Sequence, residues 1–114
     1  MNSLIKVRPL VSDFSSRNAE QILGEGTPRI GVLIDGTDNF AARYLLNDLA
    51  VKHSIPLIYG GAVATTGMSL TVLPHTSACL RCIFPDIPAP GAAMTCDTAG
   101  ILGPVATMVA AITR

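Results

Sequence analysis

An apolar run that leads into a polar turn and then into a helix is the feature that most constrains the fold of this chain. Residues 30–34 are continuously apolar, as in parallel strands that are covered on both faces. Four polar side chains follow at once, those of Asp35, Thr37, Asp38 and Asn39. Open α/β sheets bind ligands at the carboxyl ends of their strands. The pattern predicts an α/β domain with a candidate ligand site in this turn, but Asp38 or Asn39 could equally do no more than cap the helix that follows.

The helix after this turn is predicted over residues 40–53, where the apolar side chains recur with helical spacing. Arg43 and Asp48 are expected to lie off its apolar stripe. The stripe itself is expected to consist of Ala41, Tyr44, Leu45, Leu49 and the stem of Lys52.

The chain ahead of this feature is expected to hold one strand and one helix. Residues 4–11 alternate apolar and basic side chains, and Pro9 favours an edge position, so they are predicted as an edge strand. Residues 17–23 follow two serines and carry an acid and an amide in their first turns, which predicts a short helix.

The chain beyond residue 53 is predicted to add two strands, a loop and a helix. Residues 57–59 read as a strand followed by two glycines, where a second backbone or a ligand can come close. Residues 69–73 read as another strand, antiparallel because the connection is too short for a crossover helix. Residues 74–91 hold four of the eight prolines and no periodicity, which predicts a loop. A last helix is expected with Pro104 in its first turn.

Length and charge bound the class of protein. The 114 residues fit one domain, and eight basic and eight acidic residues cancel, so neither a nucleic acid nor an anionic membrane is expected as a partner. The chain is 49% hydrophobic and only 14% charged, so a second subunit or a further part of the domain is expected to cover one face. No signal peptide and no apolar run of the roughly 20 residues that a membrane span needs is recognisable, which predicts a cytoplasmic protein.

Two clusters of cysteine offer metal or redox chemistry. Cys79 and Cys82 form a CxxC, which in a reducing compartment is half of a zinc site, a redox pair or a coincidence. A redox pair should open a helix, and the residues after Cys82 look like a loop, so a zinc half-site is favoured. Cys96, His75 and His53 are possible further ligands, none at a familiar spacing. Cys96 alone reads as a nucleophile or as a small semi-buried residue, and both histidines read as structural or surface residues.

The sequence contains no recognisable loop for binding phosphates. Neither GxGxxG after a strand nor GxxxxGK[ST] occurs, and the glycines at positions 24 and 26 follow a helix and precede a strand, the reverse of the required order. A nucleotide enzyme built from these residues alone would lack its phosphate anchor.

Taken together, these motifs resemble the ThiF/MoeB/HesA family, the bacterial relatives of ubiquitin-activating enzymes. Four stretches carry the resemblance in the order of the family, and they read IDGTDNFAARYLLND, PLIYGGAVATTGMSLTVL, CLRCIFPDIPAPGA and CDTAGILGP. The resemblance implies a partial Rossmann-like parallel sheet with helices, plus an antiparallel strand and a crossover loop. It also implies that residues 1–114 are a single domain fragment lacking the N-terminal nucleotide-binding half.

The resemblance further implies a set of functional residues. Asp38 would help to hold magnesium and the ATP phosphates, since a hard cation prefers a carboxylate. Asn39 would lie beside the nucleotide. Asp35 would fix the turn. Cys79 and Cys82 would be the first zinc pair, and Cys96 would be the crossover-loop cysteine that bonds covalently to carrier or sulfur in some members.

The activity implied by the resemblance is ATP-dependent adenylylation of the C-terminal glycine of a ubiquitin-like sulfur carrier, for thiamin, molybdopterin or related sulfur transfer. A homodimer is expected, as is usual in the family. The fragment alone is expected to be inactive, because Asp38 is present without a phosphate loop. The alternative is a non-catalytic module that binds the carrier or dimerises.

Overall fold

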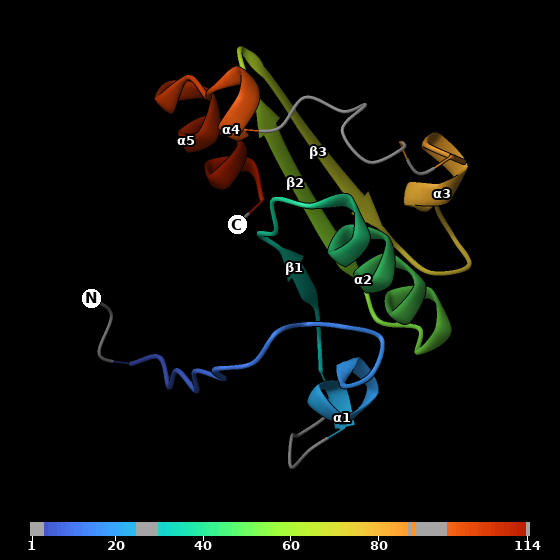
Figure 1. Ribbon diagram of the computed structural model, residues 1–114. Helices are drawn as coiled ribbons and strands as arrows, with labels where there is room; N and C mark the ends of the chain where they lie inside the picture. The colour runs from blue at the N-terminus through green and yellow to red at the C-terminus, as the bar shows by residue number, and fades with distance from the viewer. Residues whose placement is uncertain (1–3, 25–29, 87, 89–95, 114) are drawn as a thin grey trace.

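The computed structural model of the chain describes residues 4–24, 30–86, 88 and 96–113. A three-stranded sheet lies at its centre in the order β1 (Leu33–Asp35), β2 (Leu57–Val63) and β3 (Thr66–Val72) (Figure 1). β1 and β2 are parallel, and β2 and β3 form an antiparallel pair. The mixed α/β fold agrees with the predicted partial Rossmann-like sheet with an added antiparallel strand.

Two helices cover opposite faces of this sheet. α2 (Phe40–Lys52) contributes Ala50 to a core cluster with Leu57 of β2, whereas Val109 of α5 (Gly103–Ile112) lies close to Gly60 of the same strand. Positions 57 and 60 point to opposite faces because side chains alternate along a strand. Figure 1 shows α2 and α5 on either side of the sheet.

The predicted strand at residues 57–59 is longer than expected. β2 continues through the two glycines to Val63, because β3 pairs with it over seven residues, from Leu57 opposite Val72 to Val63 opposite Thr66. The antiparallel orientation predicted for the following strand is confirmed.

The helix predicted at residues 40–53 is confirmed, with His53 as its C-terminal cap, but its buried face differs from the prediction. Ala41 is exposed, and Asn47 is buried with 1% of its surface accessible. Arg43, expected off the apolar stripe, has a side chain that is only 13% exposed. Both polar residues are buried because they have partners on other elements, which a helical period cannot reveal.

The N-terminal prediction is partly wrong. Residues 4–11 are not a strand in the described structure and take no part in its sheet of β1, β2 and β3. Alternation alone does not make a strand, which also needs a partner with which to share a ladder of hydrogen bonds. The short helix is present as α1 (Ala19–Gly24), two residues later than expected.

The loop predicted at residues 74–91 contains a short helix, α3 (Leu80–Ile83), so that prediction is wrong in part. The helix entered at Pro104 is confirmed as α5, and α4 (Cys96–Ala99) precedes it. Two hydrogen bonds join the chain before α5 to the β2–β3 turn: Ala64 donates to the backbone oxygen of Gly100 at 3.0 Å, and Leu102 donates to that of Ala64 at 2.9 Å.

Large apolar side chains remain exposed over much of the described chain, as the composition predicted. They include Ile34 on β1 and Met108 and Ile112 on α5. The helices in the described ranges are all too short or too polar to cross a membrane.

Candidate functional site

The turn after β1 is fixed by a buried carboxylate. Asp35 is 5% exposed, and its Oδ1 accepts hydrogen bonds from the backbone nitrogen of Thr37 at 2.8 Å and from the Thr37 hydroxyl at 2.7 Å. This is an Asx-type turn, in which a side chain replaces a backbone acceptor. The role expected for Asp35 is therefore confirmed.

Arg43 ties α2 to the same turn. Its Nη2 donates a 2.9 Å hydrogen bond to the backbone oxygen of Thr37, and its Nε lies 3.8 Å from Oδ2 of Asp35. The guanidinium carbon lies 5.5 Å from the ring centre of Phe40 and 5.4 Å from that of Tyr59, both within cation–π range. Arg43 thus places a positive charge behind the turn.

Sequence reasoning missed this role of Arg43, although one signal was available. Arg43 follows Phe40 by three residues, so both lie on the same face of α2. The buried Nε of Arg43 has no hydrogen-bond partner in the described structure, so its burial depends on the two rings and on the Asp35 charge.

The structure decides between the two possible caps of α2. Oδ1 of Asn39 accepts a 2.8 Å hydrogen bond from the backbone nitrogen of Ala42, so Asn39 is the N-cap. Asp38 is exposed, and its carboxylate has a 3.5 Å contact with the Asn39 amide. Magnesium is commonly held by one or two carboxylates together with substrate phosphates, so a single exposed carboxylate at this position fits such an ion.

The two cysteines of the CxxC lie close together at the start of α3. Cys79 is the N-cap of this helix, Cys82 lies within it, and their sulfur atoms are 3.6 Å apart. Two thiolates bound to one tetrahedral zinc at about 2.3 Å each would be about 3.8 Å apart. The pair fits half of a zinc site. Cys79 is the N-cap of a helix of only four residues, and the chain leaves it after Ile83, so the loop predicted after Cys82 is confirmed at residues 84–86.

The described residues do not complete a metal site around this pair. They contain no group of three or more His, Cys, Asp or Glu side chains able to hold a metal ion. His53 instead lies 2.7 Å from Oε2 of Glu20, and His75 lies 3.2 Å from the Ser54 hydroxyl. Cys96 begins α4, and its side chain lies outside the described part of the structure.

Opposing effects act on the pKa of the Cys79 thiol. Partial burial is the largest single effect and raises the pKa of this thiol, but hydrogen bonds, first those of the Cys82 backbone and side chain, together outweigh it and lower the pKa of Cys79. The backbone of Arg81 and the side chain of Asn47 act in the same direction.

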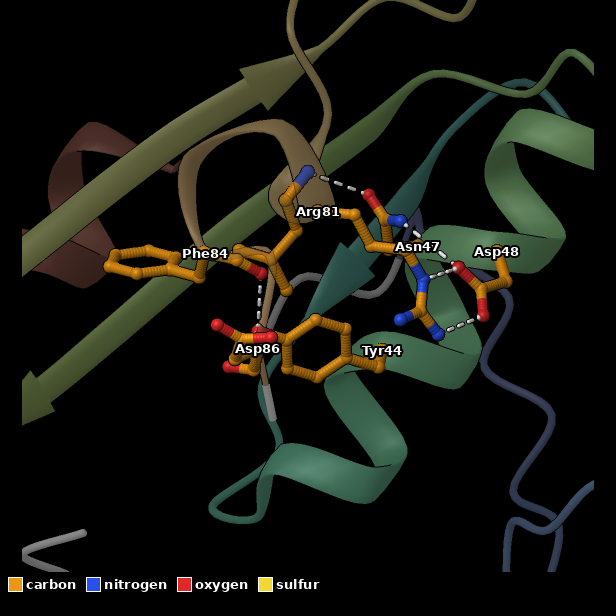
Figure 2. Close-up of polar contacts among 7 residues, drawn as sticks. Tyr44, Asn47, Asp48, Arg81, Phe84 and Asp86 are labelled. Carbon is orange, nitrogen blue, oxygen red and sulfur yellow. Dashed lines mark hydrogen bonds and ion pairs between the residues drawn. The ribbon is translucent and has the colours of Figure 1, made fainter. Parts of the chain in front are cut away.

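One face of α2 holds the segment that carries the cysteines (Figure 2). Oδ1 of Asn47 accepts a 2.8 Å hydrogen bond from the backbone nitrogen of Leu80. The Tyr44 hydroxyl donates to the backbone oxygen of Phe84 at 2.7 Å, and it also contacts that of Asp86 at 3.3 Å. Three backbone groups around α3 are thereby bonded to α2.

An exposed ion pair adds to this contact. Arg81 donates two hydrogen bonds to the carboxylate of Asp48, at 2.7 and 2.6 Å, and its guanidinium lies 4.9 Å from the ring centre of Tyr44. The hydrogen bonds from Arg81, partly opposed by burial, lower the pKa of Asp48. α2 therefore carries the polar turn at its N-terminus and holds the cysteine pair from its middle.

A parallel strand with a polar turn at its carboxyl end, joined to a helix that also holds a cysteine pair, defines an α/β domain. The chain belongs to the ThiF family, whose model matches residues 1–113.

Several proteins in this family are similar to the chain. The sulfur carrier protein ThiS adenylyltransferase of Bacillus subtilis is 38% identical over 110 residues, which are 96% of this chain and 31% of that protein. The SAMP-activating enzyme E1 of Haloferax volcanii is 34% identical over 103 residues, 90% of this chain and 36% of that protein. The adenylyltransferase and sulfurtransferase MOCS3 of Culex quinquefasciatus is 38% identical over 113 residues, 98% of this chain and 25% of that protein. The chain thus spans only part of the length of each relative.

Proposed function

We propose that this chain is the central to C-terminal part of an ATP-dependent adenylyltransferase that activates the C-terminal glycine of a ubiquitin-like sulfur carrier. Membership of the ThiF family and the activities for which its relatives are named support the proposal. The observation that carries it is the turn after β1, where Asp35 and Arg43 fix the backbone and leave the carboxylate of Asp38 exposed.

This arrangement of the turn suits the adenylylation of the carrier by ATP. Magnesium, when bound with ATP, would neutralise charge on the phosphates. Asp38 would offer the cation a carboxylate, and Asn39, already used as the helix cap, would keep that carboxylate at the start of α2. The N-terminus of α2 adds the positive end of a helix dipole on the same side.

The 114 residues are proposed to be inactive by themselves, since they supply this carboxylate without a phosphate-binding loop. Cys79 and Cys82 are proposed as half of a structural zinc site, and Cys96 as the cysteine that reacts with carrier or sulfur. A homodimer and a cytoplasmic location are part of the same proposal.

A chimera tests the proposed function. The 110 matching residues of the Bacillus subtilis relative are replaced by those of this chain, and ATP–pyrophosphate exchange is measured with the carrier ThiS. We expect the chimera to support exchange and its Asp38→Ala variant to lose about a hundredfold or more, the scale of several kcal/mol of charge stabilisation. Asp13→Ala, which changes another exposed aspartate, is the matched control and should exchange normally.

Each other outcome contradicts a stated part of the proposal. A folded chimera that binds ThiS by calorimetry but does not exchange pyrophosphate would favour a non-catalytic carrier-binding module. An active chimera that tolerates Asp38→Ala would remove Asp38 from the site. Exchange by the 114 residues alone, abolished by Asp38→Ala, would overturn the proposed inactivity.

A further inference from the structure

Asn47 is a buried polar side chain in the middle of α2. It is 1% exposed, its Oδ1 accepts the hydrogen bond from the backbone nitrogen of Leu80, and its Nδ2 lies 3.3 Å from Oδ1 of Asp48. A buried amide destabilises a fold unless its polar atoms are bonded. Asn47 has both its oxygen and its nitrogen engaged, so its burial serves a contact between α2 and α3.

This contact replaces a missing helix cap. Leu80 is the first residue of α3, so its backbone N–H is one of the groups that a helix cannot satisfy internally. Cys79 occupies the N-cap position but makes no side-chain cap hydrogen bond. The acceptor comes instead from Asn47, which is 33 residues away in sequence.

The position of Leu80 fixes the two thiols beside it. The Leu80 side chain is buried, Cys79 packs against the core cluster that α2 shares with the sheet, and the backbone nitrogen of Cys82 donates to the oxygen of Cys79 at 3.0 Å. The 3.6 Å between the two sulfur atoms is thus set by groups of the protein itself.

We propose that Asn47 is a positioning residue for the Cys79–Cys82 pair. By capping Leu80 it keeps the two thiols as a preformed two-sulfur chelate for a soft, thiol-seeking Lewis acid, before any such group binds. The inference rests on the proposed metal-binding role of the pair. The test of this inference uses neither zinc nor nucleotide, so a failure of the inference can be distinguished from a failure of the proposed function.

Phenylarsine oxide probes such a pair directly. In its hydrated form, phenylarsonous acid, it reacts with two thiols on one protein: two As–O and two S–H bonds break, two As–S bonds form and two waters leave, with no change of oxidation state. The chain contains three cysteines, so the titration is done on the reduced protein in a Cys96→Ser background.

Three variants separate positioning from general stability. Asn47→Ala should weaken phenylarsine oxide binding about tenfold or more, the scale seen when outer-shell partners of metal ligands are removed. Asn47→Asp keeps an oxygen facing the Leu80 N–H and should recover most of the affinity. Asn18→Ala is the matched control, because Asn18 also accepts from a backbone nitrogen, that of Ser15 at 2.9 Å, away from the cysteines. It should bind the arsenical as the parent does.

Unchanged affinity in Asn47→Ala would overturn the inference, and so would an equal loss in Asn18→Ala. Circular dichroism establishes whether Asn47→Ala is folded. If Asn47→Ala is not folded, measurements on the parent protein and on Asn47→Asp test the inference. Slow hydrogen exchange at the Leu80 amide together with tight arsenical binding in both supports the inference. A Leu80 amide that exchanges as fast as open loop amides in the parent, or a folded Asn47→Asp with the full tenfold loss, refutes it.

Discussion

The guanidinium of Arg43 donates a 2.9 Å hydrogen bond to the backbone oxygen of Thr37 and so joins the first turn of α2 to the turn that precedes the helix. The contact matters because Asp38 and Asn39 lie between these two residues in sequence. A backbone loop held at both ends has little freedom, so the exposed carboxylate of Asp38 keeps a defined place at the carboxyl end of β1. Electrostatic sites depend on such preorganisation.

Arg43→Met should destabilise the domain by about 2 kcal/mol or more, because it leaves the buried Asp35 carboxylate without its positive neighbour. Methionine retains much of the apolar stem between the rings of Phe40 and Tyr59, so the loss reports mainly on charge and hydrogen bonding. Urea unfolding followed by circular dichroism measures the change.

Arg81→Met is the control for this experiment. Arg81 also makes an ion pair and lies over an aromatic ring, but its side chain is 44% exposed. Exposed ion pairs contribute little to stability. A loss for Arg81→Met as large as that for Arg43→Met would contradict the claim that burial makes the Arg43 contact important.

The parts of the fold that the sequence predicted are those determined locally. α2 follows from its periodicity, the turn from the ability of Asp35 to bond two residues ahead, and the antiparallel orientation of β3 from a short connection. The strand expected at residues 4–11 fails for the opposite reason. Alternation marks a possible strand, but a strand also needs a neighbour with which to pair.

The parts of the site that sequence reasoning missed depend on contacts between distant residues. The burial of Asn47 and the helix at Leu80 explain one another, yet 33 positions separate them. The Cys79–Cys82 motif was visible as a spacing, and the 3.6 Å between its sulfur atoms was not. The predicted role of Asp38 is still a prediction, since the structure places its carboxylate without testing what it binds.

Gly67→Ala should destabilise the packing of α5 on β3 by about 1–3 kcal/mol, the usual effect of overfilling a close contact. A methyl group at this position would lie 2.7 Å from Cγ2 of Val109 and 3.0 Å from Cγ1 of Val105. Valine is branched next to its backbone and cannot easily move away. Urea unfolding of the single variant gives the loss.

A second substitution tests the cause of that loss. Adding Val109→Ala should make Gly67→Ala less costly than it is alone, because the nearer of the two colliding methyl groups, Cγ2 of Val109, is gone, and a double-mutant cycle measures the coupling. Gly31→Ala, where an added methyl group meets nothing within 4 Å, should change stability by no more than about 0.5 kcal/mol. Strictly additive effects at positions 67 and 109 would contradict the proposed contact.

Acid should weaken the contact between Asp48 and Arg81. Hydrogen bonds from Arg81 lower the pKa of Asp48 in the folded state, so this pair stabilises the fold above the ordinary aspartate pKa of about 3.9. That contribution is lost as the pH falls through the lowered value. Asp48→Asn should therefore be less stable than the parent at neutral pH, and the difference should shrink at low pH and in high salt. The effect is small because Asp48 is 45% exposed. A difference that grows on acidification would contradict the direction of the pKa shift.

The chain purified in the presence of zinc should hold clearly less than one zinc ion per molecule. A structural zinc takes four ligands, and Cys79 and Cys82 supply two, with no further described side chain completing a group. Metal analysis after gel filtration measures the content. Cys79→Ser and Cys82→Ser should each remove what zinc remains, whereas His75→Ala should not, since its ring lies beside Ser54. One tightly held zinc per chain, insensitive to either cysteine substitution, would show that the metal binds elsewhere. One zinc per chain lost in both cysteine variants would show that residues outside the described set complete the site.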